Sequence, residues 1–318
     1  MIKFVLMTKV DKQNKLLFYI KGYSHRFSPK RNLEKKINSL RRSLSKQDLD
    51  TAEYRVDYYN KLNQSQKVDH FGTKIKDLLH PKTPKSYYFD TYEYAKYFDK
   101  DLLIDYAFGD VNTILPFPMI TKSRPIYGDN QNNILLNLDK ARHFVSVEDN
   151  KRFEDKRNRL IGRAAVHQQH RADFFNQYFD NPLCELGQVN KHGGDPKWIK
   201  PKITIDEHLK YKFILSLEGN DVATNLKWIM SSNSIAVAPS LKMETWYMEG
   251  TLVPNQHYIQ IAEDYSDLEE RLEYFTENKN EALSIIEEAK KYRSNFNNKK
   301  LEDLISLLVL KKYFDLVS

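Results

Sequence analysis

The segment from Tyr211 to Pro239 constrains the fold most. Residues 213–217 (FILSL) and 235–238 (IAVA) are short apolar runs of strand length. Between them lie a turn at 218–221 (EGND) and a stretch at 223–231 (ATNLKWIMS) with helical character. Two buried strands joined by a turn and a helix are typical of a parallel α/β sheet. We therefore expect a Rossmann-like lobe in this part of the chain.

The residues that follow this segment extend the same pattern. Residues 257–261 (HYIQI) are a third strand candidate. The sequence SDLE at 266–269 has the spacing of a capping box, in which Ser266 and Glu269 satisfy each other's backbone amides, and it predicts a helix to about Phe275. Two further amphipathic helices are expected at the end of the chain, at about 281–293 and 301–314.

The first third of the chain has a different pattern. An apolar stretch at 16–20 precedes helical patterns at about 32–44 and 49–62. Residues 64–87 are polar and contain two prolines that interrupt a helix, which indicates a surface connection. Residues 102–120 combine short apolar runs with one glycine and two prolines. That combination predicts a strand, a turn and a constrained return.

Length and composition favour two lobes without a membrane span. The chain has 318 residues, of which 41% are hydrophobic, and this length fits two domains of ordinary size. Its apolar runs are far shorter than the ~20 residues that a membrane span needs. The first residues lack a long apolar stretch followed by a cleavage site, so we expect a cytoplasmic protein. Cys184 is the only cysteine and is interpreted as a small buried apolar residue.

The net charge of +7 points to an anionic partner. A nucleotide, a phosphorylated glycolipid, an acidic membrane surface and nucleic acid all fit that charge. Much of the excess lies in one segment that runs into a predicted helix, and this segment is either a solvated helix face or a contact with an acidic surface. Its charged or titratable residues are Lys21, His25, Arg26, Lys30, Arg31, Lys35, Lys36, Arg41 and Arg42.

The turn at 218–221 is a candidate phosphate site. Gly219 permits close approach of the backbone, and unpaired amides at a helix start attract anions. Because Glu218 and Asp221 place negative charge at this turn, a carboxylate or Asn220 would bind ribose hydroxyls while Thr224, Asn225 and the helix amides face the phosphates. The alternative is an ordinary helix capped by Asp221 or Thr224.

Three other residues are candidates for transfer chemistry. Asp110 follows Gly109 after a short apolar stretch, so its carboxylate could accept a proton at a strand end, although Gly-Asp is also common turn chemistry. Arg163 and Arg171 offer planar donor groups of the kind that bind a diphosphate. Their alternative interpretation is as surface arginines.

The sequence offers no convincing metal site. His167 and His170 (HQQH) would share one helix face, but no third ligand is apparent, which favours substrate contact or hydrogen bonding. Asp48-Leu49-Asp50 resembles the DxD signature of metal-dependent sugar transferases, yet it lies in a polar, helix-rich segment. We interpret it as a solvated helix start.

Five separated segments together resemble glycosyltransferase family 90. They span roughly residues 55 to 293 in the family's order and are most similar to the bacterial lipopolysaccharide core-modifying branch. The eukaryotic protein O-glucosyltransferases are related. The segments are DYAFGDVNTILPFPMITKSRPI (105–126), DNQNNILLNLDKARHF (129–144), RLIGRAAVHQQHRADFF (159–175), YKFILSLEGNDVATNLKWIMSSNSIAVAP (211–239) and ETWYMEGTLVPNQHYIQI (244–261) with DYSDLEERL (264–272).

The resemblance implies a GT-B fold, in which two Rossmann-like lobes face each other across a cleft and the C-terminal lobe holds the donor nucleotide. It also implies inverting transfer without a metal. We accordingly expect an acceptor-side lobe at 1–150 with a basic helical start and a nucleotide-sugar-binding lobe at 151–295. A terminal helix at 296–318 is expected to pack back on the first lobe.

The resemblance also assigns roles to individual residues. Asp110 falls on the position of the family's catalytic base, and Arg163 on the arginine of its aromatic-Arg-Gly motif, which is Gly162-Arg163-Ala164 here. The eukaryotic branch has an arginine near the position of Asn225, where Lys227 is the nearest basic residue. The expected donor contacts are Arg163, Arg171, Glu218, Gly219, Asn220, Asp221, Val222, Ala223, Thr224, Asn225 and Lys227. Further candidate substrate contacts are Lys122, Ser123, Arg124 and His167.

The resulting functional prediction is an inverting hexosyltransferase that needs no metal and no cofactor. It would move glucose or galactose from a UDP-sugar to a hydroxyl of a lipopolysaccharide or lipooligosaccharide core sugar, with its basic N-terminal segment in contact with the anionic inner membrane. Alternatives from other classes are a nucleic-acid-binding protein and a sugar-nucleotide-binding protein without catalysis. No nucleic-acid recognition signature occurs in the sequence, so we expect no nucleic acid partner.

Overall fold

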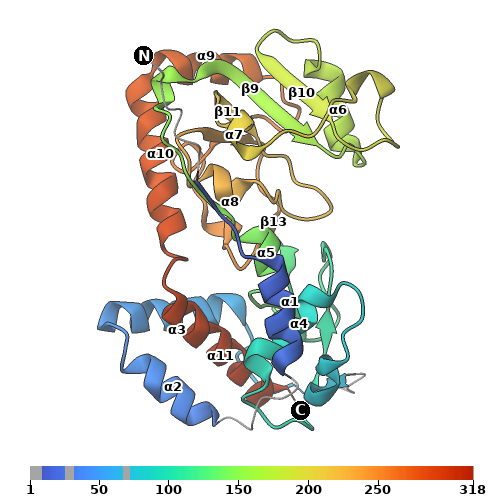
Figure 1. Cartoon of the computed structure of the whole chain (residues 1–318), viewed down its shortest axis with the longest axis vertical. Coiled ribbons are helices and arrows are strands. Elements are labelled where there is room, and N and C mark those ends of the chain that lie inside the picture. Colours follow the sequence, from blue (N-terminus) through green and yellow to red (C-terminus); the bar gives the residue numbers. More distant parts are fainter. Residues whose placement is uncertain (1–8, 26–31, 67–71, 318) are drawn as a thin grey trace. The chain divides into compact units, whose positions relative to one another are not determined.

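The computed structural model describes residues 9–25, 32–66 and 72–317, and the chain divides into two compact units (Figure 1). These units differ from the expected lobes. Residues 1–12 belong to the unit that contains most of the C-terminal half, and residues 242–250 and the terminal helix belong to the unit that contains most of the N-terminal half. Unit 1 comprises 1–12, 143–241 and 251–294; unit 2 comprises 13–142, 242–250 and 295–318.

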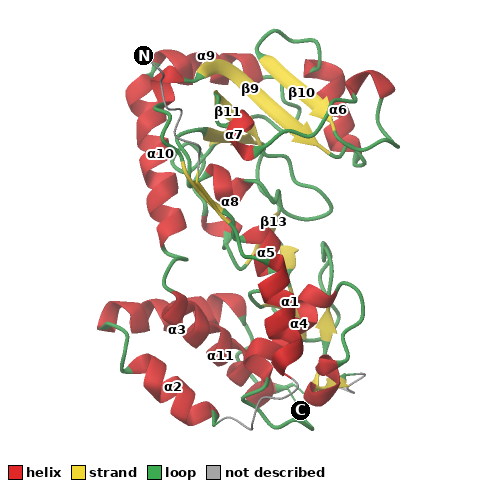
Figure 2. Ribbon diagram, viewed as in Figure 1, coloured by secondary structure: helices red, strands yellow, loops and turns green. Residues whose placement is uncertain are grey.

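Unit 1 is built on a five-stranded parallel sheet (Figure 2). Its strand order is β10-β9-β11-β12-β14, so the order reverses between β9 and β11. The predicted β-turn-α-β unit is confirmed, although its helix is a single turn. The strands are β9 (Arg157–Ala164), β10 (Cys184–Gln188), β11 (Tyr211–Leu215), β12 (Ile235–Ala238) and β14 (Ile259–Gln260); the helices are α6 (Gln169–Tyr178), α7 (Ile205–His208), α8 (Leu226–Ile229), α9 (Leu268–Glu277) and α10 (Lys279–Ser294).

The core of unit 1 joins its sheet to its helices. Strand residues such as Leu160, Phe213 and Val237 are buried, and so are Phe174 of α6 and Leu272 of α9. Near-continuous apolar strands are expected in a parallel sheet, because such sheets are covered on both faces. Cys184 is buried in the same core, which confirms its interpretation as a small apolar residue.

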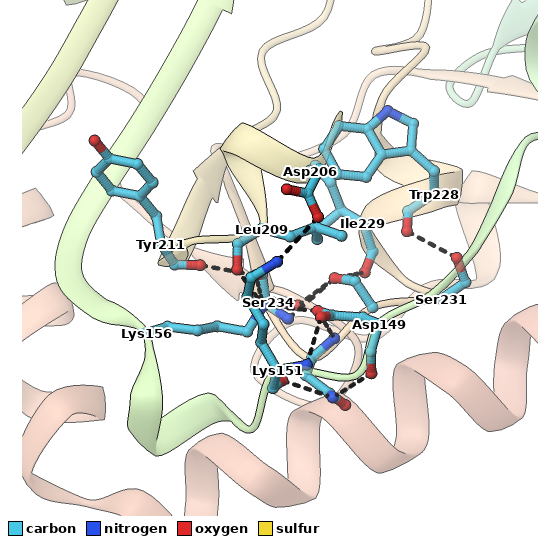
Figure 3. A network of polar contacts seen from close by, with 12 residues as sticks. Asp149, Lys151, Lys156, Asp206, Leu209, Tyr211, Trp228, Ile229, Ser231 and Ser234 are labelled. Carbon is cyan, nitrogen blue, oxygen red and sulfur yellow. Dashed lines mark hydrogen bonds and ion pairs between the residues drawn. The ribbon is translucent and has the colours of Figure 1, made fainter. Parts of the chain in front are cut away.

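A buried polar network holds the amino ends of these strands together (Figure 3). The Lys156 ammonium, just before β9, donates to Asp149 at 2.6 Å, to Ser234 at 2.9 Å and to the carbonyl of Leu209 at 2.7 Å. These three bonds use all three of its donors. Burial lowers the pKa of Lys156 to about 8, against the opposing effect of Asp149. The network therefore fixes the edge of the sheet from which β9, β11 and β12 start.

Unit 2 combines helices with three small sheets. Helix α11 packs against α2, α3 and α4, and strand β13, from late in the chain, pairs with β6 in antiparallel register. The helices are α1 (Lys15–Ser24), α2 (Leu33–Arg41), α3 (Lys46–Tyr59), α4 (Lys85–Ala95) and α11 (Lys299–Leu316), with α5 (Lys140–His143) at the boundary between the units. The strands are β2 (Thr73–Lys74), β3 (Leu103–Ile104), β4 (Tyr106–Ala107), β5 (Met119–Thr121), β6 (Ser123–Pro125), β7 (Asn133–Leu135) and β13 (Met243–Thr245); in unit 1, β1 (Lys9–Asp11) pairs with β8 (Ser146–Glu148).

Buried ionic and aromatic contacts join α3 to α11 within unit 2. The Arg55 guanidinium donates to both carboxylate oxygens of Glu302, at 2.5 and 3.0 Å. Trp246 donates its indole N–H to the same carboxylate and stacks on Tyr59, with 3.9 Å between the ring centroids. Because these charges are buried, the loss of either partner would leave the other charge without compensation.

Two local predictions have clear outcomes. The capping box at Ser266 is wrong: the Ser266 hydroxyl donates to Asp264 at 2.7 Å, and α9 starts after Asp267 without a side-chain cap. A turn closed by Asp264 competes for that hydroxyl. The interpretation of Asp48-Leu49-Asp50 as a helix start is confirmed, because Asp48 forms a capping box with Ser45 at the start of α3.

Candidate functional site

A pocket of about 300 Å³ lies at the carboxyl ends of β9 and β11 in unit 1. In open parallel sheets, ligands bind where the strand order reverses. That reversal occurs between these two strands, so the topology and the pocket point to one place. The pocket is lined by Gly162, Arg163, Ala164, Ala165, Arg171, Ile205, His208, Leu215, Leu217, Ala223, Thr224, Asn225 and Trp228.

Arg171 connects the two strand-end loops at this pocket. From the first turn of α6, its guanidinium donates to the carbonyl oxygens of Ala165, Leu217 and Glu218, each at 2.8 Å. Burial lowers the pKa of Arg171, although the charge of Glu218 opposes this. Carbonyl oxygens bind the guanidinium without cancelling its full charge, so Arg171 both fixes the loops and keeps the pocket positive.

Arg163 borders the same pocket but turns toward β10. It donates to the carbonyl of Glu185 at 2.9 Å and to its carboxylate at 3.0 Å, and Lys200 contacts that carboxylate at 3.1 Å. Although burial opposes it, the hydrogen bonds from Lys200 and Arg163 hold the pKa of Glu185 below its ordinary value. The Nε of Arg163 is buried without a hydrogen-bond partner among the described residues. The Arg163 side chain therefore packs closely against Gly187 of β10, while the residue still borders the pocket.

The turn after β11 contributes only part of its predicted residues to the pocket lining. Asn225 is held in place because its amide donates to the carbonyl of Leu215 at 2.8 Å and its oxygen accepts from Ser216 at 3.2 Å. Neither Asp221 nor Thr224 caps α8, which has no side-chain cap. The predicted donor residues that line the pocket are Arg163, Arg171, Ala223, Thr224 and Asn225; those outside the lining are Glu218, Gly219, Asn220, Asp221, Val222 and the fully buried Lys227.

An apolar wall of the pocket was missed by sequence reasoning. Ile205 and His208 of α7 lie beside Trp228 of α8, and the rings of His208 and Trp228 meet edge to face at 5.7 Å. Burial lowers the pKa of His208, so the imidazole is neutral near pH 7. No periodic signal marks α7, which is four residues long, and only the sheet topology brings it to the pocket.

Unit 2 brings Asp110 and Lys122 together at the end of its own parallel strands. β4 and β5 are neighbours in parallel register, with Ala107 opposite Thr121, so the residues that follow them share one edge. The Lys122 ammonium lies 2.5 Å from the Asp110 carboxylate. The Lys122 side chain is 1% exposed, whereas the Asp110 side chain is 30% exposed. The carboxylate is thus oriented from the protein side and open on the other.

Side chains from two strands hold the loop that carries Asp110. The Ser123 hydroxyl donates to the carbonyl of Val111 at 3.0 Å and accepts from its amide at 3.1 Å. The Asn133 amide group donates to the carbonyl of Thr113 and accepts from the amide of Leu115, at 2.9 and 3.0 Å. The loop has no regular structure, and these bonds fix it at three residues that follow Asp110.

An aromatic group beside Asp110 was also missed. Tyr87 of α4 stacks on Phe108, with 5.5 Å between the ring centroids, and Phe108 stacks on Tyr106 at 4.1 Å. Burial raises the pKa of Tyr87, and the charges of Lys122, Asp139, Asp110 and Arg142 also act on it. The Tyr87 phenol thus belongs to the same charged environment as Asp110.

Comparison with known proteins decides the family of this chain. The sequence profile of glycosyl transferase family 90 matches residues 148–318. The O-glucosyltransferase LpsA of Dichelobacter nodosus is 40% identical over 265 residues, which are 83% of each chain. The chain belongs to glycosyl transferase family 90. It is a glycosyltransferase, and its partners are a sugar donor and an acceptor.

The family match at 148–318 covers the pocket of unit 1 and leaves Asp110 outside it. All thirteen lining residues lie within 148–318. A second relative, the uncharacterized protein 179R of invertebrate iridescent virus 6, is 29% identical over 133 residues, which are 40% of this chain and 11% of that protein. The match to LpsA is long enough to include Asp110 and Lys122, whose roles stay predictions.

The remaining predicted residues of this family 90 member have varied surroundings. Arg124 is fully buried and donates to Glu244 at 2.7 Å and to the carbonyl of Tyr58 at 2.7 Å, so it ties β6 to β13 and α3. His167 lies before α6 rather than in it, whereas His170 contacts the carbonyl of Glu218 at 2.8 Å. Contact of Arg124 or His167 with substrate stays a prediction.

Within the described ranges, no group of three or more His, Cys, Asp or Glu side chains is arranged to hold a metal ion. Among the same residues, no helix combines the length and apolar character that crossing a membrane requires.

Proposed function

We propose that this family 90 member is an inverting hexosyltransferase that moves the sugar of a UDP-hexose to a hydroxyl of a lipopolysaccharide or lipooligosaccharide core sugar. The main support for a sugar-donor site is the arginine-containing pocket of unit 1, at the point where the strand order reverses. The name of the relative, O-glucosyltransferase, favours glucose over galactose as the transferred sugar.

The donor diphosphate would bind at the arginine side of the pocket. Arg171 brings a charge that only carbonyl oxygens contact by hydrogen bonds, and Arg163 lines the same pocket. Planar guanidinium groups suit a diphosphate, whose charge rises as it leaves. Two arginines supply this positive charge without a divalent ion, which supports metal-independent transfer.

The nucleoside would bind against the apolar wall. Trp228 and the neutral His208 present ring edges and faces, and Ile205 closes the same side. A pyrimidine can stack on such a surface. Thr224 and Asn225 supply the polar groups that a ribose needs.

Asp110 would act as the general base. It accepts the proton of the attacking hydroxyl while the oxygen forms a bond to the anomeric carbon and the UDP leaves from the opposite face, which inverts the configuration. Lys122 holds the carboxylate in one orientation, and the Ser123 bonds fix the adjacent backbone. A GT-B arrangement, with the donor on unit 1 and the base on unit 2, is part of this proposal.

The acceptor half of the proposal follows from the similarity to the bacterial lipopolysaccharide branch and from charge. On α2, Lys35 and Arg41 are exposed, and basic side chains of this kind attract anionic lipid surfaces. Arg26, Lys30 and Arg31 lie outside the described residues. We propose peripheral contact of this segment with the anionic inner membrane, where a core-sugar acceptor is anchored.

Thermal denaturation with UDP tests the donor site. At a UDP concentration 100 times its Kd, binding adds about 2.7 kcal/mol, which raises the Tm by about 5 to 10 °C. We expect this rise in the presence of EDTA, and a smaller rise with ADP. Stabilisation that appeared only with manganese or magnesium would contradict metal independence, and no response to any uridine nucleotide would remove the donor assignment. Slow hydrolysis of individual UDP-sugars then identifies the hexose.

A further inference from the structure

Helix α1 is attached to unit 2 by a narrow face. Phe18 and Gly22 are buried against α4, and His25 is buried just beyond the end of the helix. Phe18 meets the Phe89 ring edge to face at 6.2 Å. A Cβ added at Gly22 would lie 2.5 Å from that ring, so only glycine permits this approach. The rotation of α1 about its axis is therefore fixed by its contacts with α4.

The opposite face of α1 is apolar and exposed. Leu16, Leu17 and Ile20 are 70%, 63% and 56% exposed, and Tyr19 and Tyr23, which contact Phe89, are 37% and 38% exposed. Five of the thirteen exposed large apolar side chains in the described residues thus lie on this ten-residue helix. Side chains at i and i+4 share a helix face, which places Leu16 and Ile20 together. A contiguous apolar surface of this kind marks an interaction site.

Lysine side chains lie on and beside this helix. Lys15 and Lys21 belong to the helix itself, and Lys85 of α4 donates to the Tyr23 hydroxyl at 3.0 Å. Residues 13–46 contain ten Lys and Arg side chains and a single acidic one, Glu34. Lys21 also contacts Glu93, yet its side chain remains 53% exposed. Apolar and cationic groups therefore lie side by side on one exposed helix.

We propose that the outward face of α1 inserts into an anionic lipid surface. Leucine and isoleucine side chains enter the boundary between headgroups and acyl chains, while nearby lysines contact lipid phosphates. This lipid contact rests on the proposed function in one respect, because its purpose would be to bring the enzyme to a lipid-anchored acceptor. A second copy of the chain fits poorly, because two such faces would bring like charges together. Nucleic acid also fits poorly, because aliphatic side chains do not form base-stacking platforms.

Vesicle flotation tests the surface directly. The full chain should bind vesicles of phosphatidylcholine with 30% phosphatidylglycerol and bind pure phosphatidylcholine at least about tenfold more weakly, since both charge and apolar area contribute. The double variant Leu16→Gln/Ile20→Gln should lose about tenfold or more of the binding to anionic vesicles. The matched control Tyr54→Gln/Leu102→Gln removes two exposed apolar side chains elsewhere in unit 2 and should bind normally. Equal binding by both double variants would overturn the proposal.

A tryptophan probe provides a second readout. The three native tryptophans are buried, so Leu17→Trp adds an exposed reporter whose emission should shift to the blue with anionic vesicles. An unshifted emission would show that α1 stays in water. Concentration-dependent dimerisation that Leu16→Gln/Ile20→Gln abolishes would assign the face to a second copy and also overturn the proposal.

The outcome is separable from that of the proposed function. UDP stabilisation and UDP-sugar hydrolysis by the Leu16→Gln/Ile20→Gln variant should equal those of the unsubstituted protein, because the pocket lies in the other unit. Loss of vesicle binding with normal UDP response supports the lipid role alone. Failure of UDP binding in the unsubstituted protein removes the donor assignment and leaves the vesicle result intact.

Discussion

Replacing Asp110 by asparagine tests whether its carboxylate acts in chemistry or only as the partner of Lys122. Asparagine keeps the size of the side chain and tolerates the same turn, but it cannot take a proton. Loss of a general base typically costs about 100- to 10,000-fold in rate. We therefore expect Asp110→Asn to lose transfer by that factor. UDP stabilisation should persist, because Asp110 does not line the donor pocket.

The structure also predicts a cost in stability. The Lys122 side chain is 1% exposed and its ammonium lies 2.5 Å from the carboxylate. The variant leaves that ammonium with a neutral amide, which should cost about 1 to 3 kcal/mol. For a domain of 150 to 250 residues, this lowers the Tm by about 2 to 12 °C. The protein should still fold, since Ser123 and Asn133 continue to hold the loop.

The double variant Asp110→Asn/Lys122→Met separates the two roles. Removing both charges eliminates the uncompensated buried ammonium, so the Tm should recover most of its loss relative to Asp110→Asn. Transfer measured with a UDP-sugar and a core oligosaccharide should stay as low as in Asp110→Asn. The single variant Lys122→Met is the reference. If the double variant instead transferred sugar within about tenfold of Lys122→Met, Asp110 would be only a structural partner and the base must be sought elsewhere.

Two further predictions concern unit 1. Arg163→Ala should weaken UDP binding by more than Lys200→Ala, because both side chains contact Glu185 but only Arg163 lines the pocket. The loss of a charge-assisted contact costs about 1.5 to 3 kcal/mol. Equal Kd values for the two variants in titration calorimetry would remove Arg163 from the site. Cys184 is buried, and burial raises its pKa to about 12. At pH 8, iodoacetamide should therefore modify Cys184 at least about 100-fold more slowly in the native protein than in the unfolded protein. Comparable rates in the two states would contradict its burial.

Sequence patterns predicted unit 1 better than unit 2, and the reason lies in strand length. In unit 1, β11 and β12 are apolar runs of five and four residues, so their strand character is visible. In unit 2, β4 is a strand of two residues, too short for any periodic signal. The helix predicted at 223–231 is a single turn in the structure. The Asn225 side chain donates a hydrogen bond to the carbonyl of Leu215, which keeps the residues before the helix irregular.

Among the site residues, the sequence could identify chemistry but not contacts. Asp110 and Arg171 were chosen for their residue types, and the structure adds their partners, Lys122 for the first and three carbonyls for the second. Lys122 was predicted to contact substrate, and its burial against Asp110 depends on the pairing of β4 with β5. That pairing joins segments separated by a turn and two prolines, so no local pattern reveals it.

The two candidate sites use parallel strands in different ways. In unit 1, the order of strands reverses between β9 and β11, so the loops diverge and leave a pocket that can hold a nucleotide. In unit 2, β4, β5 and β7 follow one another without reversal, and the loop after β4 is held against its neighbours by Lys122, Ser123 and Asn133. Donor binding requires space for a large ligand, whereas a general base requires one rigid carboxylate with an open side. In the proposed function, the reversal would supply the first and the uninterrupted sheet the second.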